Sequence, residues 1–183
     1  MDVTIDIDKT ILKTDRLRLR AWKESDINDF YEYACVPGVG EMAGWHHHES
    51  IDVSQKVLQS FISGKNEFAI TYNESGKVIG SVGLHESWAN ADSEYSHLKM
   101  KNVGYVLSKD YWGKGIMPEA VAAVISFCFD ECNVDALTCG HSRENRRSKR
   151  VIEKCGFLYV KNNEYYDTPL QMTFSGMRYI LFR

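Results

Sequence analysis

The chain has 183 residues, of which 44% are hydrophobic, and a formal net charge of -3 at pH 7. This length is sufficient to bury one sizeable core, so we expect a single domain over residues 1–183. The slightly acidic balance excludes a general attraction to nucleic acid or to an anionic membrane, so any phosphate site must be local.

Targeting signals and cysteine usage point to a cytoplasmic protein. No apolar stretch approaches the roughly 20 residues that a membrane-spanning helix requires, and the acidic N-terminus does not resemble an export signal. We therefore expect no membrane partner. The five cysteines are odd in number and scattered, which favours reduced core thiols over a disulfide framework.

The first half of the chain predicts one strand, two helices and a hairpin. Residues 16–20 alternate leucine with arginine, the pattern of a half-buried strand. Apolar residues at helical spacing follow Ser25 and Ser50, which are plausible N-caps for two helices. Residues 67–84 indicate an antiparallel hairpin, and residues 86–101 a long polar loop.

The second half predicts a further α+β succession without internal repeats. Strands are expected at residues 103–107 and 136–141, and helices at residues 117–130 and 146–155. An antiparallel pair of strands follows Gly156 and ends at residues 179–182. The helix over residues 117–130 has the most regular apolar stripe, and Pro118 suits its first turn.

A glycine-rich segment, WGKG at residues 112–115, connects the strand at 103–107 to this helix. Free backbone N–H groups at a helix N-terminus bind phosphate, and glycines allow a ligand to approach the backbone closely. A tight turn without a ligand is an equally good explanation of this segment alone. A nucleotide P-loop is excluded, because Gly-Lys is followed by Gly115 rather than by Ser or Thr.

Two segments together resemble the motifs of the GNAT superfamily of N-acetyltransferases. YWGKGIMPEA, at residues 111–120, resembles motif A. The residues similar to motif B follow in order and at the expected separation: Asn145, Ser148, Glu153, Lys154, Gly156 and Phe157. TDRLRLR, at residues 14–20, is similar to the opening of the RimJ/RimL-type branch, typified by ribosomal-protein N-terminal acetyltransferases, and the resemblance spans roughly residues 10–183.

The resemblance implies an α+β fold with a mixed, mostly antiparallel twisted sheet, splayed central strands and about four flanking helices. It also implies acetyl-CoA as co-substrate. The backbone of Val106, Leu107 and Ser108 would pair with the pantetheine arm, Asn145 would hydrogen-bond it, and Ser148 would lie near the sulfur. The pyrophosphate would be held by Trp112, Gly113, Lys114, Gly115, Ile116 and Met117. Trp112 and Met117 depart from the usual signature, which should alter packing more than function.

The proton-transfer residues are less clearly marked. Ile152 stands at the position where many family members carry a tyrosine that acts as the acid and protonates CoA. A thiolate of pKa about 8.5 leaves readily, so this loss should slow rather than abolish turnover. Ser148 is a candidate acid, with tight packing as the alternative. Glu86 and His85, at the end of the hairpin, are candidate bases, with a solvated strand end as the alternative.

The run Trp45-His46-His47-His48 follows several glycines and predicts a flexible connection between the first two helices. Adjacent histidines point in different directions, so no metal site is expected. A solvated loop is one interpretation. In the resembling family this connection lines the acceptor cleft, which makes Trp45 and His48 candidates for substrate contact.

The function expected is N-acetylation of a primary amine, with a protein or peptide N-terminal α-amine as the favoured acceptor. A small-molecule amine, such as a polyamine, an amino acid or an aminoglycoside, is an alternative, and a non-catalytic acyl-CoA-binding module is another. The acidic loop with Glu86, Asp92 and Glu94 slightly favours a cationic acceptor. The basic residues at 143–150 are interpreted as a solvated face. One or two of these residues could neutralise the CoA 3′-phosphate. The oligomeric state is left as monomer or homodimer.

Overall fold

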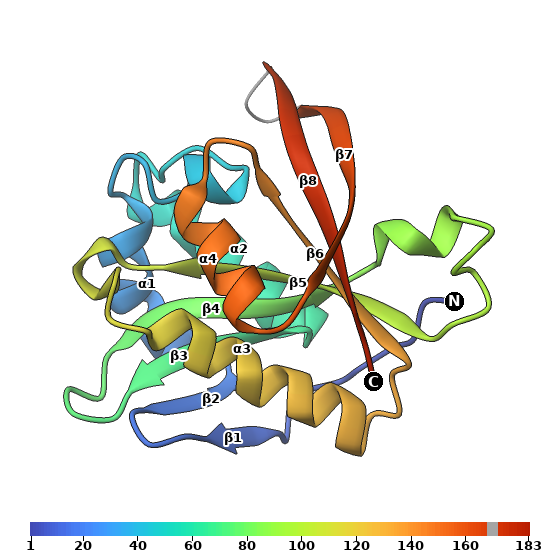
Figure 1. The fold of residues 1–183 in the computed structure, drawn as a ribbon. Coiled ribbons are helices and arrows are strands. Elements are labelled where there is room, and N and C mark those ends of the chain that lie inside the picture. The colour runs from blue at the N-terminus through green and yellow to red at the C-terminus, as the bar shows by residue number, and fades with distance from the viewer. Residues whose placement is uncertain (168–171) are drawn as a thin grey trace.

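The computed structural model describes residues 1–167 and 172–183, which form one sheet covered on both faces (Figure 1). Eight strands of this part of the chain lie in the order β1-β2-β3-β4-β5-β6-β8-β7. Their bounds are Ile11–Lys13, Leu17–Ala21, Glu67–Tyr72, Val78–His85, Met100–Leu107, Ala136–Ser142, Leu158–Asp167 and Met172–Phe182 for β1 to β8. All neighbours are antiparallel except β5 and β6, which are parallel.

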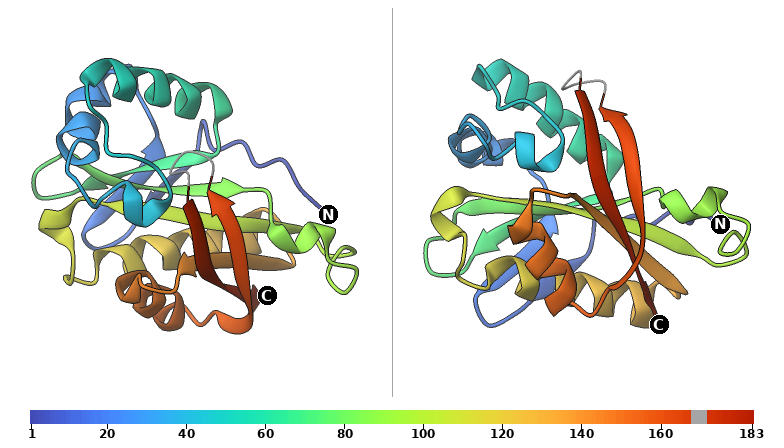
Figure 2. Two further views of the ribbon diagram at one scale, coloured as in Figure 1. Left: turned by 90° about the horizontal axis from the view of Figure 1, so that it is seen from above. Right: turned by 45° about the horizontal axis from the view of Figure 1, so that its top comes forward.

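Four α-helices flank the sheet. Helices α1 (Ile27–Ala34) and α2 (Ile51–Gly64) cover one face, and α3 (Ile116–Ser126) and α4 (Arg146–Lys154) cover the other (Figure 2). The predicted α+β class, with a mostly antiparallel sheet and about four helices, is therefore confirmed. None of the helices in the described residues is long and apolar enough to cross a membrane.

The two faces of the central strands bury different hydrophobic clusters. Phe68 and Ile70 of β3 belong to the larger cluster, with the apolar stripe of α3, whereas Ala69 packs among residues of α1 and α2. This follows from the two-residue period of a strand, since consecutive side chains point to opposite faces. Strands β3 and β4 are thus fixed in register by burial on both sides.

The strands β5 and β6 separate partway along the sheet. They pair only through Met100–Ala136, Lys101–Leu137 and Asn102–Thr138. Beyond Asn102, the side of β5 that faces β6 has no strand partner, so its backbone N–H and C=O groups are available to another molecule. The predicted splay of the central strands is confirmed, and it creates the space in which the site lies.

Several element bounds differ from the prediction. Strand β5 begins at Met100 rather than at residue 103, because its first residues pair with β6. The predicted polar loop contains a short 3-10 turn over Trp88–Ala91. The long helix expected to residue 130 changes to a π-helical turn at Phe127–Glu131. Strand β1 was not predicted, since three residues are too few to show an alternation.

Candidate active site

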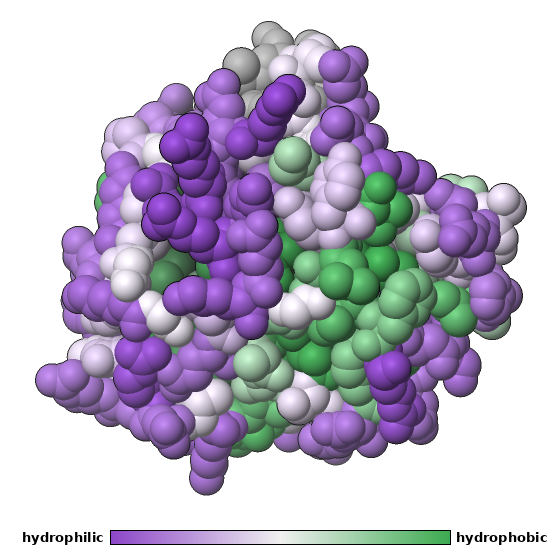
Figure 3. All heavy atoms as spheres, in the orientation of Figure 1, coloured by the Kyte–Doolittle hydropathy of each residue, from purple (hydrophilic) through white to green (hydrophobic). Residues whose placement is uncertain are grey.

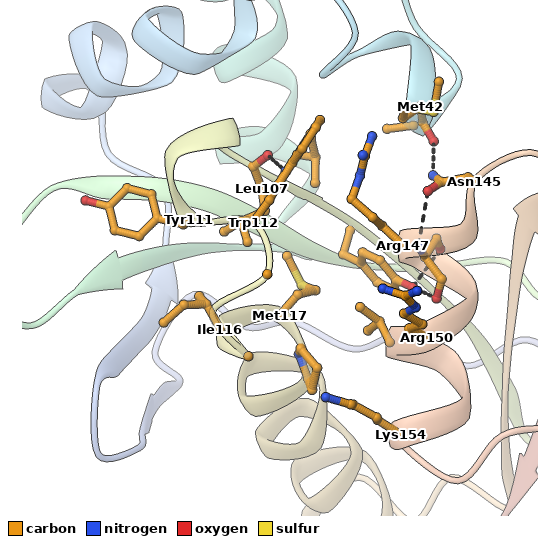
Figure 4. Close-up of a pocket in the computed structure, with 18 of the residues that line it drawn as sticks. Met42, Leu107, Tyr111, Trp112, Ile116, Met117, Asn145, Arg147, Arg150 and Lys154 are labelled. Carbon is orange, nitrogen blue, oxygen red and sulfur yellow. Dashed lines mark hydrogen bonds between the residues drawn. The ribbon is translucent and has the colours of Figure 1, made fainter.

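A cleft of about 540 Å³ lies between β5, the glycine-rich loop and α4 (Figure 4). Gly113 and Gly115 border it, with φ angles of 77° and 74°. Such left-handed angles suit glycine and turn the chain so that α3 starts at the cleft wall. No side chain caps the N-terminus of α3 in the structure. Its first amides and the positive end of its dipole are therefore suited to an anion.

An ion-pair clamp holds this loop from the far side. Arg16 donates to the Lys114 carbonyl oxygen at 2.9 Å and pairs with Glu119, in the first turn of α3, at 2.6 Å. Thr14 donates from Oγ1 to the same carboxylate at 2.5 Å. Burial acts to raise the pKa of Glu119, but these hydrogen bonds lower it overall. The TDRLRLR segment thus positions the glycine-rich loop, a role that the sequence alone did not indicate.

Helix α4 supplies positive charge to the cleft. Arg147, Arg150 and Lys154 line it, and Figure 4 shows the three side chains extending from α4. The surface over α4 is strongly hydrophilic (Figure 3). The Arg147 guanidinium lies 4.0 Å from the centre of the Trp112 ring, a cation–π contact. The basic segment is therefore more than a solvated face, because two of its arginines face the cleft.

The open edge of β5 presents only alternate residues to the cleft. Ser108 donates its N–H to Ile79 of β4 at 2.8 Å. In an antiparallel ladder the backbone groups of every second residue point to the same neighbour, so Val106 is also directed at β4, and Tyr105 and Leu107 face the open side. The prediction that the backbone of Val106 and Ser108 meets pantetheine is corrected accordingly. The Leu107 carbonyl already accepts from the Trp112 indole at 2.8 Å.

A second cleft, of about 780 Å³, lies on the other side of the splay. It shares five lining residues with the first cleft: Met42, Ala43, Tyr105, Asn145 and Ser148. The two clefts therefore meet at one junction. A donor in the first cleft and an acceptor in the second would bring their reactive ends together there.

Two hydroxyl groups lie at this junction. Tyr105 Oη is 2.8 Å from Ser148 Oγ, and it also donates to the Ser148 carbonyl oxygen at 3.2 Å. Burial raises the pKa of Tyr105 well above its ordinary value, so the phenol stays protonated at neutral pH. Sequence reasoning identified Ser148 and missed Tyr105, which had been assigned only to a strand.

Asn145 acts as a structural link at the same junction. As the N-cap of α4, its Oδ1 accepts the Ser148 N–H at 3.1 Å. Its Nδ2 donates to the Met42 carbonyl oxygen at 3.1 Å. The predicted contact of Asn145 with pantetheine would use its remaining N–H or the second lone pair of Oδ1. The short turn Glu41–Ala43 is held against α4 in this way.

A histidine–carboxylate pair lies beside the second cleft. His85 Nε2 is 3.3 Å from Oε1 of the buried Glu67 of β3, a residue that sequence analysis did not single out. Gly83 lies opposite Glu67 in the register, and a Cβ there would be 2.2 Å from Glu67 Oε1. Only glycine leaves room for the pair. The hydrogen bond to Glu67 raises the pKa of His85. Glu86 also lines this cleft and is exposed.

Neither Trp45 nor His48 lines either of these two clefts, and their contact with substrate stays a prediction. His48 is buried, bonds Ser54 Oγ through Nδ1 at 2.7 Å, and packs between the rings of Phe30 and Trp45. Met42 and Ala43, from the same connection, line both clefts instead.

Glu41 fixes the connection that carries Met42 and Ala43. Its carboxylate accepts from the Gly38 N–H at 2.7 Å and contacts His47 Nδ1 at 2.7 Å. Burial acts to raise the pKa of Glu41, but these hydrogen bonds lower it to about 2. Among the described residues, no group of three or more His, Cys, Asp or Glu side chains could hold a metal ion.

The profile of the acetyltransferase (GNAT) domain matches residues 16–158. The chain belongs to the GNAT acetyltransferase family. A relative from Bacillus licheniformis, described as uncharacterized N-acetyltransferase p20, is 26% identical over 151 residues, which are 80% of this chain and 81% of the relative. This acetyltransferase assignment agrees with the two joined clefts, since the family uses acetyl-CoA and transfers its acyl group.

Solved structures of GNAT proteins share the fold. An acetyltransferase from Bacillus anthracis aligns with a TM-score of 0.81 at 18% identity, over 94% of this chain and 98% of that one. The ribosomal-protein-S5-alanine acetyltransferase from Vibrio fischeri aligns with a TM-score of 0.69 at 19% identity, over 93% and 96%. The microcin C7 self-immunity acetyltransferase MccE, in complex with acetyl-CoA and AMP, aligns with a TM-score of 0.75 at 18% identity, over 93% and 94%. At these identities, the neighbours show the shared fold.

Proposed function

We propose that this GNAT protein is an acetyl-CoA-dependent N-acetyltransferase that acts in the cytoplasm, as one domain, on a primary amine. The favoured acceptor is the α-amine of a protein or peptide N-terminus. The observation that carries the proposal is the junction of the two clefts at Tyr105 and Ser148. One cleft has the anion-binding loop and the cations of α4, and the other ends at the His85–Glu67 pair.

The transfer proceeds by direct attack of the neutral amine on the thioester carbonyl carbon. The C–N bond forms, the amine loses one proton, and the C–S bond then breaks to release the CoA thiolate. Tyr105 remains a neutral phenol, so it can donate a hydrogen bond to the tetrahedral oxyanion or a proton to the departing sulfur. Ser148 holds the Tyr105 hydroxyl in place, while Ile152 occupies the position of the usual tyrosine of α4.

His85, oriented by Glu67, accepts the amine proton directly or through water. Glu86 is the alternative base in the same cleft. An α-amine of pKa near 7.8 costs about 1 kcal/mol to deprotonate at pH 7, whereas a lysine of pKa near 10.4 costs about 4.6 kcal/mol. A histidine base is therefore adequate for an α-amine. This difference, together with the ribosomal-protein acetyltransferase among the structural neighbours, supports an α-amine acceptor.

A small-molecule amine is the second candidate, and MccE, which is described as a self-immunity acetyltransferase, shows that this fold also occurs in acetyltransferases with other roles. Release of free thiol from acetyl-CoA tests the proposal, with N-terminal peptides, free amino acids, polyamines and aminoglycosides as acceptors. Amine-dependent thiol release is expected. Tight binding of acetyl-CoA without thiol release for any amine would instead support a non-catalytic acyl-CoA-binding module.

A further inference from the structure

The floor of the second cleft, which we call the acceptor cleft, is formed by β6, β8 and β7. Gly140 and Ser142 of β6 lie opposite Arg178 and Gly176 of β8 in the register, and all four line the cleft. Because directly opposed residues share a face, these positions form one surface. Three of the four have little or no side chain. Arg178 is thus the one large side chain in this part of the floor.

Arg178 is a cation without a carboxylate partner among the described residues. Its guanidinium lies 4.9 Å from the centre of the Trp88 ring, and Trp88 lines the same cleft. Burial lowers the pKa of Arg178, which indicates that its lost hydration is not compensated by a neighbouring acid. An arginine remains charged nevertheless. A partly desolvated guanidinium favours an incoming anion, and its planar fork matches a carboxylate.

The neighbouring cation, Lys161, differs from Arg178 because it has a carboxylate partner. Lys161 of β7 lies opposite Arg178 in the register, and its ammonium is 5.1 Å from the same Trp88 ring. It is paired with Asp92 at 2.8 Å, however, and does not line the cleft. Of the three acidic residues from which a cationic acceptor was expected, Asp92 is thus already paired, Glu94 lies outside this cleft, and Glu86 lines it.

From this arrangement we propose that the acceptor carries a carboxylate that pairs with Arg178 while its amine lies at the junction near Tyr105. This inference rests on the proposed function and specifies its substrate class. The carboxylate is either that of a free amino acid or an acidic side chain near the N-terminus of a peptide. Both sources present the same chemistry to the guanidinium.

The experiment compares acceptors of matched shape that differ in charge, and each rate is divided by the fraction of neutral amine, because an adjacent carboxylate also raises the amine pKa. Glycine and γ-aminobutyrate are each tested against their amides, and the C-terminally amidated peptide Ser-Asp-Ala-Ala against Ser-Asn-Ala-Ala. Ethanolamine phosphate is tested against ethanolamine. Turnover is followed by thiol release, and affinity for the complex with CoA by calorimetry. The amino-acid and peptide pairs distinguish the two sources of the carboxylate.

At least one carboxylate acceptor is expected to be preferred over its amide by roughly 10- to 100-fold, the range for a charge-assisted pair. Arg178→Gln should abolish that preference and leave the KM for acetyl-CoA unchanged. Arg178→Lys, which keeps the charge without the fork, should retain part of it. The matched control Lys161→Gln should keep the full preference, since it removes a cation that Asp92 already neutralises.

Equal use of acids and amides by the wild-type protein would overturn the inference and leave the proposed function intact. A preference confined to the phosphate compound, or one that survives Arg178→Gln, would overturn it as well. If no amine supports thiol release, the proposed function fails, and the calorimetric comparison still decides whether the cleft selects a carboxylate. Melting curves exclude a folding defect in each variant.

Discussion

The replacement Tyr105→Phe removes one hydroxyl group from the junction and leaves the aromatic ring in place. If this phenol protonates the departing sulfur or stabilises the oxyanion, kcat should fall. General acid catalysis contributes about 10²- to 10⁴-fold. The CoA thiolate is a good leaving group, so we expect an effect at or below the lower end of that range. We expect kcat to fall about 10- to 100-fold, which corresponds to about 1.4–2.7 kcal/mol in the barrier.

The contacts of the hydroxyl separate this effect from that of Ser148. Tyr105 Oη is bound both by Ser148 Oγ at 2.8 Å and by the Ser148 carbonyl oxygen at 3.2 Å. Ser148→Ala removes only the first contact, because the carbonyl belongs to the backbone. The phenol should stay oriented, and we expect kcat to fall less than about fivefold, with each variant losing about 1 kcal/mol of stability for one hydrogen bond.

The assay measures kcat and KM by thiol release, with the melting temperature as a control for folding. A stability loss of 1 kcal/mol should lower the melting temperature of a chain of this size by about 2–4 °C. The KM for acetyl-CoA should change little. If Tyr105→Phe keeps kcat within threefold of the wild-type value while Ser148→Ala lowers it strongly, the assignment of the phenol is refuted and Ser148 is the acid.

Three further predictions concern the phosphate loop, the base and the clamp. Gly113→Asp should raise the Kd for acetyl-CoA about tenfold, since a like charge about 6 Å from a phosphate costs about 1–3 kcal/mol. The control Gly113→Asn tolerates the same φ and should change this Kd less than threefold. Equal effects of the two substitutions would show that the diphosphate binds elsewhere. Glu67→Gln removes the carboxylate that raises the pKa of His85, so the acidic limb of the pH profile of kcat/KM should move to lower pH; an unchanged limb would exclude His85 as the base. Arg16→Ala should raise the KM for acetyl-CoA severalfold without changing that for the acceptor, as measured by initial rates, because Glu119 and the loop lose their clamp; an unaltered KM would show that the loop holds its shape alone.

The geometry of the glycine-rich loop could be predicted from the sequence because it depends on consecutive residues. Gly113 and Gly115 adopt positive φ angles within a strand–loop–helix segment, and this requirement is visible in the residue types themselves. The helix that follows was equally clear from its apolar period. A short segment of the chain is thus sufficient to specify the anion-binding end of the donor cleft.

The proton-transfer residues could not be predicted in the same way, because they depend on pairing between distant strands. Tyr105 meets Ser148 only because β5 and β6 separate after Asn102, which allows α4 to approach the open edge. Glu67 meets His85 only in one register of β3 against β4, with Gly83 opposite the carboxylate. A strand pattern shows which residues alternate, but it does not show which face stays open or which residue lies opposite.

Two independent features of the acceptor cleft favour the same class of amine acceptor. The hydrogen bond to Glu67 raises the pKa of His85. A histidine base suits an α-amine better than a lysine or a polyamine, whose amines cost about 4.6 kcal/mol to deprotonate at pH 7. Arg178 adds an unpaired positive charge to the floor, which repels a polyamine and attracts a carboxylate. An acidic peptide N-terminus satisfies both requirements, whereas a polyamine satisfies neither. The charge of the floor and the strength of the base therefore select the same acceptor, although they arise from different strands.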